Sequence, residues 1–163
     1  MFALEYRYIM QYCIVSVKTI NAILHLSKIG FIMALWRFMD YSSEAGNNLI
    51  EDWYLDQSEN VQADFDATLK NLSIAPDWRG MKEFKALGME GLCEIRFKTD
   101  NVQYRPTGSF GPGDQTFTIW IGCSKKQSIY NPPDAFEKAK KRKRDFYNKQ
   151  KGQQKGILRE RII

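Results

Sequence analysis

Three consecutive segments in the second half of this 163-residue chain alternate apolar and polar residues with a period of two. Successive side chains of a strand point to opposite faces of its sheet, so this period predicts strands. In the first segment, Cys93, Ile95 and Phe97 share the apolar face. Turn-like sequences separate the segments. The chain is therefore predicted to form an antiparallel meander over Leu92–Lys98, Val102–Thr107 and Thr116–Ser124.

Helical signals surround the meander. A strand is expected over Leu35–Tyr41, after which Asn47 or Asn48 is expected to cap a short helix. A longer helix is predicted from Glu59 to Ser73, because apolar residues recur there every three or four positions. Asp134 is expected to cap a final helix. The expected fold class is α+β, with an N-terminal helical hairpin packed on a small, mostly antiparallel sheet and with a C-terminal helix.

Composition divides the chain into three parts. Residues 1–32 are rich in apolar residues, but charged residues interrupt them, so no run reaches the ~18 apolar residues that a membrane span needs. A secretory signal is also weak. We interpret residues 1–32 as an N-terminal extension; an alternative hypothesis is that the native protein starts at Met33. Residues 33–149 are predicted to form the domain, and residues 150–163 a basic tail that is loose from Gly152 onward.

Charge is distributed unevenly along the chain. The formal net charge is +5, but residues 135–163 hold 11 Lys and Arg against 3 acids. A basic end suggests a polyanionic partner met from one side; a solubilising tail is the alternative. The three cysteines form no CxxC pair, and there is a single histidine. Neither a disulfide framework nor a metal site is supported, so we expect no cofactor and a cytoplasmic location with reduced thiols.

Positive charge collects on the polar face of the predicted meander. Arg96 and Lys98 share this face of the first strand, Arg105 lies on the second strand, and Lys125 and Lys126 follow the third. Because adjacent strands lie roughly 5 Å apart, these groups can converge on a patch about the size of one nucleotide. Clustered cations repel each other unless an anion fills the cluster, and a phosphate would do so. A solvated sheet face is the alternative interpretation.

Two strings carry a more specific signal, GLCEIRFKTDNVQYRPTGSF and TFTIWIGCSKKQSIYNPPDAFEKAKKR. They contain the strand motif Gly91–Arg96, the pair Tyr104-Arg105 on the next strand, and an apolar strand that ends in Lys125-Lys126. A proline then leads into a basic helix. In the order and spacing of these elements the chain resembles the RelE/ParE superfamily, the toxins of type II toxin–antitoxin systems. The HigB-like, phage-derived branch is the most similar, and the resemblance covers roughly residues 33–149.

The resemblance implies an endoribonuclease that cleaves messenger RNA, usually on the ribosome, without a metal. In that chemistry the 2′-hydroxyl attacks the adjacent phosphate. The resemblance implies that Arg96 and Arg105 hold this phosphate and stabilise the charge of the transition state. Lys125 or Lys126 would neutralise the leaving oxygen or act as general acid. Tyr130 would transfer a proton or stack on a base.

Further basic residues are expected to contact RNA outside the catalytic set: Lys98, Lys138, Lys141, Arg142 and Arg144. The expected partners are messenger RNA, the ribosome and a cognate antitoxin of the helix-turn-helix DNA-binding kind, with no membrane. One alternative is a ParE-like toxin that inhibits DNA gyrase without cleaving RNA, although the full cationic set weighs against it. An inactive RNA-binding remnant is the other alternative.

The sequence departs from the pattern of this superfamily in three places. Pro106 follows Arg105, where the superfamily has an ordinary strand residue. Because proline cannot donate to a β-ladder, this strand is expected to lie at an edge or to break there. The 108–114 hairpin loop is longer than usual, and Cys123-Ser124 replace an aromatic residue that often precedes the Lys-Lys pair.

Overall fold

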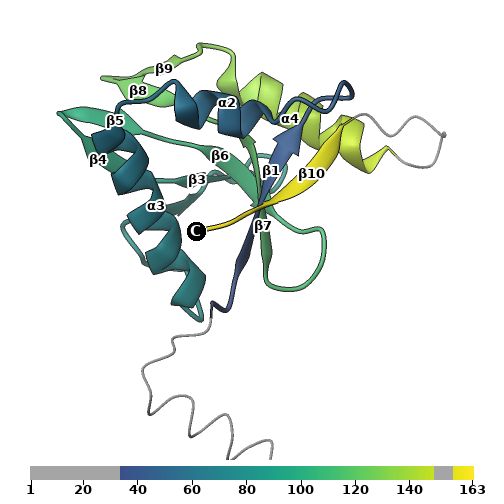
Figure 1. The fold of residues 1–163 in the computed structure, drawn as a ribbon, viewed down its shortest axis with the longest axis horizontal. Coiled ribbons are helices and arrows are strands. Elements are labelled where there is room, and N and C mark those ends of the chain that lie inside the picture. The colour runs from purple at the N-terminus through teal and green to yellow at the C-terminus, as the bar shows by residue number, and fades with distance from the viewer. Residues whose placement is uncertain (1–33, 149–155) are drawn as a thin grey trace, which may run out of the picture. The chain divides into compact units, whose positions relative to one another are not determined.

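The computed structural model describes residues 34–148 and 156–163, which form ten strands and three helices (Figure 1). The helices are α2 (Leu49–Leu55), α3 (Glu59–Ile74) and α4 (Ala135–Tyr147). The strands are β1 (Arg37–Ser42), β2 (Phe84–Ala86), β3 (Cys93–Ile95), β4 (Phe97–Thr99), β5 (Val102–Tyr104), β6 (Thr107–Phe110), β7 (Thr116–Ile121), β8 (Ser124–Lys126), β9 (Ile129–Asn131) and β10 (Ile157–Arg161). In these residues no helix is long and apolar enough to cross a membrane. The expected N-terminal extension, residues 1–32, lies outside the described residues.

Six strands form the larger sheet, in the order β10-β1-β7-β6-β3-β2. Neighbouring strands run antiparallel except β1 and β7, which are parallel. Strand β7 lies inside this sheet, and all six of its residues are buried. A strand that is covered on both faces needs apolar or hydrogen-bonded residues at every position, which the sequence TFTIWI supplies.

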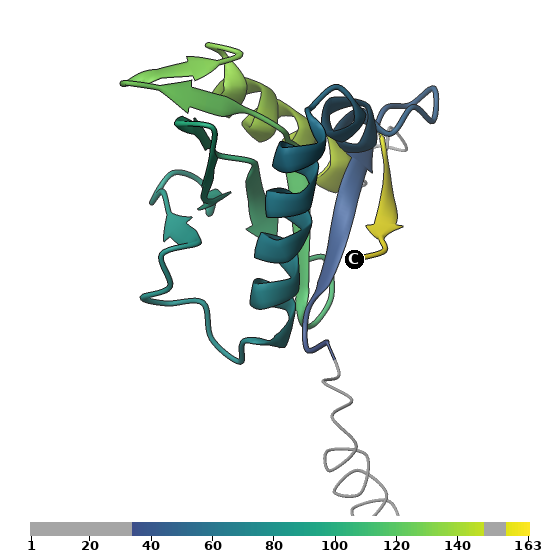
Figure 2. The same ribbon diagram turned by 60° about the vertical axis from the view of Figure 1, so that its left-hand side comes forward.

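The sheet is covered by α3 on one face and by α4 on the other (Figures 1 and 2). Phe117 and Ile119 of β7 belong to a core that includes the apolar stripe of α3. Trp120 of the same strand belongs to a second core with Phe146 of α4, whose ring centroid lies 5.9 Å from that of Trp120. The indole of Trp120 is fully buried and donates to Ser109 Oγ at 2.9 Å. Trp120 therefore packs in the interior and offers no stacking surface.

The smaller sheet has four strands, in the order β4-β5-β8-β9. It arises because each of the three strands of the predicted meander breaks once, at Arg96, at Arg105-Pro106 and at Gly122-Cys123. Around the breaks the backbone bonds change: Ile95 N donates to the carbonyl of Pro106 at 2.9 Å, while Arg105 N donates to that of Cys123 at 2.8 Å. Pro106 accepts but has no N–H to donate, which explains the break in its own strand.

The structure contradicts the expected fold class. An N-terminal helical hairpin on a small sheet does not describe a chain that is mostly β, with ten strands in sheets of six and four and three helices in its described part. Three breaks convert three expected strands into six. The short strands β2, β9 and β10 add three that the sequence analysis did not predict.

The predicted helices agree with the structure in position. Helix α3 spans Glu59–Ile74, one residue longer than expected. Asn48 caps α2, and its Oδ1 accepts from the backbone N–H groups of Ile50 at 3.2 Å and Glu51 at 3.1 Å. Asp134 lies at the N-cap position of α4 without a capping hydrogen bond from its side chain. Its carboxylate instead pairs with Lys138 at 3.0 Å.

The expectation of a loose end is wrong for residues 157–161. They form β10, which pairs antiparallel with β1 along the edge of the larger sheet. Arg161 at the end of β10 donates to both carboxylate oxygens of Asp40 in β1, at 3.0 and 2.6 Å. The same guanidinium lies 2.7 Å from Glu51 of α2. This strand is held by contacts with residues more than a hundred positions away in the sequence, and not by local sequence preference.

Candidate functional site

A row of four side chains crosses one face of the smaller sheet. Lys98 of β4 lies opposite Gln103 of β5, Gln103 lies opposite Lys125 of β8, and Lys125 lies opposite Tyr130 of β9. Residues directly opposite each other on antiparallel strands project from the same face. The ammonium of Lys125 lies over the Tyr130 ring, 4.9 Å from its centroid. We call these four residues the cross-strand row.

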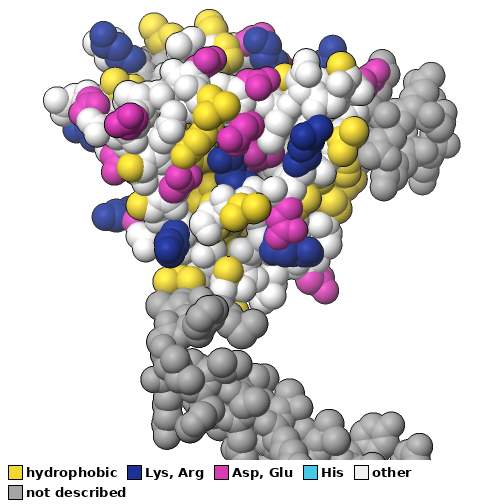
Figure 3. All heavy atoms as spheres, viewed as in Figure 1, with side chains coloured by type: hydrophobic (Ala, Val, Ile, Leu, Met, Phe, Trp, Pro, Cys, Tyr) yellow, Lys and Arg dark blue, Asp and Glu magenta, His cyan; other side chains and the backbone are white. Residues whose placement is uncertain are grey.

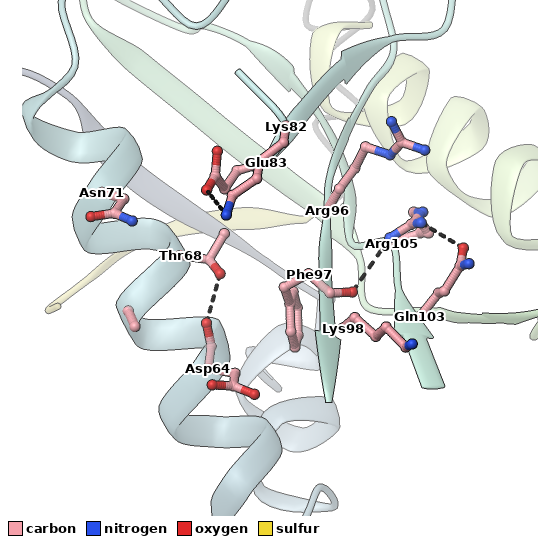
Figure 4. A pocket seen from close by; sticks show the side chains of 11 residues that line it. Asp64, Thr68, Asn71, Lys82, Glu83, Arg96, Phe97, Lys98, Gln103 and Arg105 are labelled. Carbon is pink, nitrogen blue, oxygen red and sulfur yellow. Dashed lines mark hydrogen bonds and ion pairs between the residues drawn. The ribbon is translucent and has the colours of Figure 1, made fainter. Parts of the chain in front are cut away.

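Arg105 lies beside the cross-strand row, where the chain bends between the two sheets. Its Nη1 donates to the carbonyl of Tyr104 at 2.8 Å and to that of Phe97 at 3.4 Å, while its Nη2 donates to Gln103 Oε1 at 2.6 Å (Figure 4). The residue is only 8% exposed. A guanidinium has five N–H donors. These bonds hold the group in one orientation and leave Nε and one hydrogen of Nη2 for a ligand.

Arg96 lies at the break between β3 and β4, and its side chain is 35% exposed. In Figure 4, Arg96, Lys98, Gln103 and Arg105 extend from the strands away from α3, while Phe97 turns toward α3. The Nε atom of Arg96 is buried and has no hydrogen-bond partner among the described residues. The Glu94 carboxylate lies 3.8 Å from this buried atom, so an anion from solvent would meet the other N–H donors of the guanidinium.

The two guanidiniums are close enough to influence each other. Burial lowers the pKa of Arg105, and the positive charge of Arg96 lowers it further. Glu94, Tyr130 and Cys123 act in the opposite direction. Two like charges in a partly buried site raise the local positive potential, which favours an anion between them.

Glu94 and Tyr130 form a hydrogen-bonded pair next to the arginines. Glu94 is only 2% exposed, and its carboxylate accepts a hydrogen bond from the Tyr130 hydroxyl. The second carboxylate oxygen lies 3.8 Å from Arg96 Nε. Burial raises the pKa of Tyr130 far above its ordinary value, and the bond to Glu94 adds to this effect. Tyr130 is therefore a neutral phenol at physiological pH.

A hollow of about 540 Å³ adjoins the arginines. This volume is within the range of roughly 300–1,000 Å³ that is typical of small-molecule sites. Arg96, Lys98, Gln103 and Arg105 contribute to its lining, and α3 provides the other wall with Asp64, Thr68 and Asn71 (Figure 4). Lys82, Glu83 and Phe97 also line the hollow, so cationic, acidic and apolar groups are mixed around it.

The structure brings together five of the residues that the sequence analysis proposed, but not Lys126. Lys126 follows Lys125 in β8 and lies opposite Ile129. Because neighbouring residues of a strand point to opposite faces, Lys126 lies on the face away from the cross-strand row. The five that share the site are Arg96, Lys98, Arg105, Lys125 and Tyr130.

The basic residues of α4 lie apart from the cross-strand row. Lys138, Lys141 and Arg142 line a separate hollow of about 430 Å³ beside Tyr41. Arg142 donates to the backbone carbonyl of Trp120 at 2.7 Å, and burial lowers its pKa, so it links the helix to the sheet. Arg144 is exposed. On the molecular face drawn in Figure 3, basic, acidic and apolar side chains are intermixed without a continuous basic patch.

Sequence reasoning did not propose Glu94 and Gln103 as members of the site. A signal for both was present, because Glu94 alternates with Arg96 and Gln103 alternates with Arg105. What the alternation could not show is that Glu94 is buried and bonded to Tyr130, a contact between residues 36 positions apart.

Comparisons with known protein families, with curated proteins and with solved structures found no match to this chain. Within the described residues, no group of three or more His, Cys, Asp or Glu side chains is placed to hold a metal ion.

Proposed function

We propose that this chain is an endoribonuclease that cleaves messenger RNA by attack of the 2′-hydroxyl on the adjacent phosphate. The observation that supports it most is the shared face, on which Arg96, Arg105, Lys125 and Tyr130 lie together. This face offers cations for the phosphate and groups that can transfer protons. We further propose that the protein is a metal-independent toxin of the RelE/ParE superfamily, which its sequence resembles.

The two arginines would bind the scissile phosphate. Arg105 is already held by Tyr104, Phe97 and Gln103, so little of its freedom remains to be lost when RNA binds. Arg96 supplies a guanidinium on a side chain that is 35% exposed, so its terminal N–H groups can reach the phosphate. Donors that are fixed before the reaction stabilise the negative charge that builds up on the phosphate oxygens.

Lys125 is the best placed cation for the leaving oxygen. It lies in the cross-strand row between Gln103 and Tyr130. An ammonium can donate a proton to the 5′-oxygen as the bond to phosphorus breaks. The requirement for a 2′-hydroxyl would restrict the reaction to RNA.

A chain that cuts messenger RNA acts where ribosomes translate it, and we therefore propose a cytoplasmic location. Uncontrolled cleavage would stop growth, so the proposal includes a cognate antitoxin that neutralises the protein. The sequence resemblance supports an antitoxin of the helix-turn-helix DNA-binding kind.

The experiment uses the purified full chain and messenger RNA bound to ribosomes, with cleavage read by primer extension and by analysis of the RNA ends. We expect cuts that leave a 2′,3′-cyclic phosphate and a 5′-hydroxyl. Arg105→Ala should lose at least about 100-fold in rate, as is usual when one oxyanion donor is removed. Arg79→Ala is the control, because Arg79 is exposed and forms an ion pair with Asp77, two residues before it.

Intact RNA with the wild-type chain would contradict the proposal, as would full activity in Arg105→Ala. The same preparation is assayed for inhibition of DNA supercoiling by gyrase. Inhibition of gyrase with intact RNA would favour the ParE-like alternative instead.

A further inference from the structure

The buried carboxylate of Glu94 has no role in the proposed binding of phosphate. A carboxylate has the same sign of charge as the substrate, and burying it is costly unless it is paired and hydrogen-bonded. The ion pair with Arg96 is long, at 3.8 Å. The close contact of the Glu94 carboxylate is the hydrogen bond that it accepts from the Tyr130 hydroxyl. Glu94 is therefore better explained through Tyr130 than as a partner of Arg96 alone.

Glu94 cannot touch RNA directly, because it is 2% exposed. Tyr130 is partly exposed and lies in the cross-strand row beside Lys125. The hydroxyl hydrogen of Tyr130 points at Glu94, so the lone pairs of its oxygen remain available to accept another hydrogen. Phe136 of α4 packs against the Tyr130 ring, with 4.5 Å between ring centroids, and helps to fix it.

We propose that Tyr130 and Glu94 form a proton relay that activates the RNA 2′-hydroxyl. This inference rests on the proposed nuclease function and assigns the base of that reaction. Tyr130 is the catalytic residue that contacts the substrate, and Glu94 is a positioning residue and the final proton acceptor.

The relay balances in atoms and charge. The Tyr130 oxygen takes the proton of the 2′-hydroxyl while the phenol gives its own proton to the Glu94 carboxylate. The 2′-oxygen forms a bond to phosphorus, the bond from phosphorus to the 5′-oxygen breaks, and Lys125 gives a proton to that oxygen. The products are a 2′,3′-cyclic phosphate, a 5′-hydroxyl, a neutral Glu94 and a neutral Lys125. Water then restores both side chains.

The relay explains why a phenol is found here together with a carboxylate. Because its pKa is strongly raised, Tyr130 would be almost never ionised near pH 7 and could not act as a base alone. A phenol that passes on its proton in the same step needs no ionised state. Glu94 supplies the acceptor for that proton.

Several charged or titratable groups face Glu94 from the neighbouring strands. Arg96 lies 3.8 Å away on the same segment, Arg105 lies at the bend, and Lys85 is its cross-strand neighbour on β2. Cys123 contributes no charge, because burial raises the pKa of its thiol to about 12. Arg96, Arg105 and Lys85 thus place positive charge on the strands around Glu94.

The test compares Glu94→Gln, Tyr130→Phe and the double variant in single-turnover cleavage of ribosome-bound messenger RNA across a range of pH. Each single variant should lose roughly 100-fold or more, the usual contribution of general base catalysis. The double variant should be no slower than the slower single variant, because both changes break one relay. Wild-type rates should fall toward acidic pH, and this acidic limb should vanish in Glu94→Gln. Glu90→Gln, an exposed control four residues away, should retain the wild-type profile.

A substrate with sulfur in place of the 5′-oxygen separates the relay from the general acid, because a thiolate leaves without a proton. Lys125→Ala should be rescued on this substrate, and Glu94→Gln should not. If Glu94→Gln does not fold, as judged by circular dichroism, Tyr130→Phe decides the question with the same rate loss and pH profile. An unchanged acidic limb, additive losses or a wild-type rate in these variants would overturn the relay. In that case cleavage by the wild-type chain would leave the nuclease proposal standing.

Discussion

The guanidinium of Arg105 is oriented by groups of the chain itself, namely two backbone carbonyls and the side-chain oxygen of Gln103. Because both carbonyls and Gln103 belong to β4 and β5, the orientation depends on the smaller sheet being formed. A surface arginine would lose side-chain freedom when it binds a phosphate, but Arg105 has lost that freedom on folding. Arg105 is also largely shielded from water, so a hydrogen bond from each remaining N–H donor to an anion is stronger than it would be in water.

Two buried cysteines lead to a prediction about reactivity. Cys93 and Cys123 are both buried, and burial raises the pKa of both thiols, that of Cys123 to about 12. At pH 8 almost none of Cys123 would then be a thiolate, which is the reactive form. We expect iodoacetamide at pH 8 to leave both residues unmodified in the folded protein and to modify both in urea. Mass spectrometry of the peptides measures this, and rapid labelling of native Cys123 would contradict it.

Among the elements, the helices were predictable because their signals are local. Val61, Phe65, Leu69 and Leu72 recur every three or four residues, and all four are buried in α3. Asn48 lies one residue before its helix and caps it. Such signals need no knowledge of distant parts of the chain.

The division into two sheets was not predictable in the same way. Alternation continues through the break at Arg96, since Glu94, Arg96 and Lys98 keep the same spacing on either side of it. Of the three breaks, only the one at Pro106 was predictable from the sequence, because proline has no N–H to donate. Strand β10 was missed because its partner is β1, which is more than a hundred residues away in the sequence.

The candidate site was predictable only in part, because local alternation shows which residues of one strand share a face but not how distant strands pair. Alternation placed Arg96, Lys98 and Arg105 on one face, as the structure also does. It left Lys125 and Lys126 equivalent, because the exact end of the strand decides which of them faces the row. The pairing of Glu94 with Tyr130 depends on the β8–β9 hairpin, which the sequence did not reveal.

The bend between β7 and β8 depends on a glycine. A Cβ atom at Gly122 would lie 1.9 Å from a ring carbon of Trp53, which packs on it from α2. We expect Gly122→Ala to lower the free energy of unfolding by about 1–3 kcal/mol, the usual effect of overpacking. Urea unfolding followed by fluorescence measures the change.

Trp53→Leu provides the control for this prediction, because it removes the ring that the new methyl group would meet. The double variant should be more stable than the sum of the two single losses predicts. Strict additivity of the two losses would show that the alanine acts in some other way.

For the molecule as a whole, β10 joins the end of the chain to both the sheet and α2. Arg161 contacts the buried Asp40 and the half-exposed Glu51, and its guanidinium lies 5.0 Å from the Tyr54 ring centroid. Burial raises the pKa of Asp40, while Arg161 opposes that shift. The pair thus joins the first strand of the described chain to its last strand.

Removal of Arg161 should therefore destabilise the whole fold. Arg161→Ala leaves Asp40 buried without its counter-charge, and we expect a loss of about 3–5 kcal/mol at pH 7. The loss should shrink as the pH falls, because a protonated Asp40 needs no counter-charge. Arg159→Ala is the control: Arg159 is exposed and donates one bond to Gly46, so it should cost at most about 1.5 kcal/mol. Equal losses in the two variants, measured by urea unfolding, would contradict this role for Arg161.

The proposed site depends on which side chains share the face of the smaller sheet, and two adjacent lysines test this most directly. Lys125 lies in the cross-strand row and Lys126 points the other way, although the two have the same charge and lie in the same strand. The measurement is the rate of ribosome-bound messenger RNA cleavage by Lys125→Ala and Lys126→Ala. We predict a loss of about 100-fold or more for Lys125→Ala and a rate close to that of the wild-type chain for Lys126→Ala. Equal rates for the two variants, or a larger loss for Lys126→Ala, would contradict the proposed site.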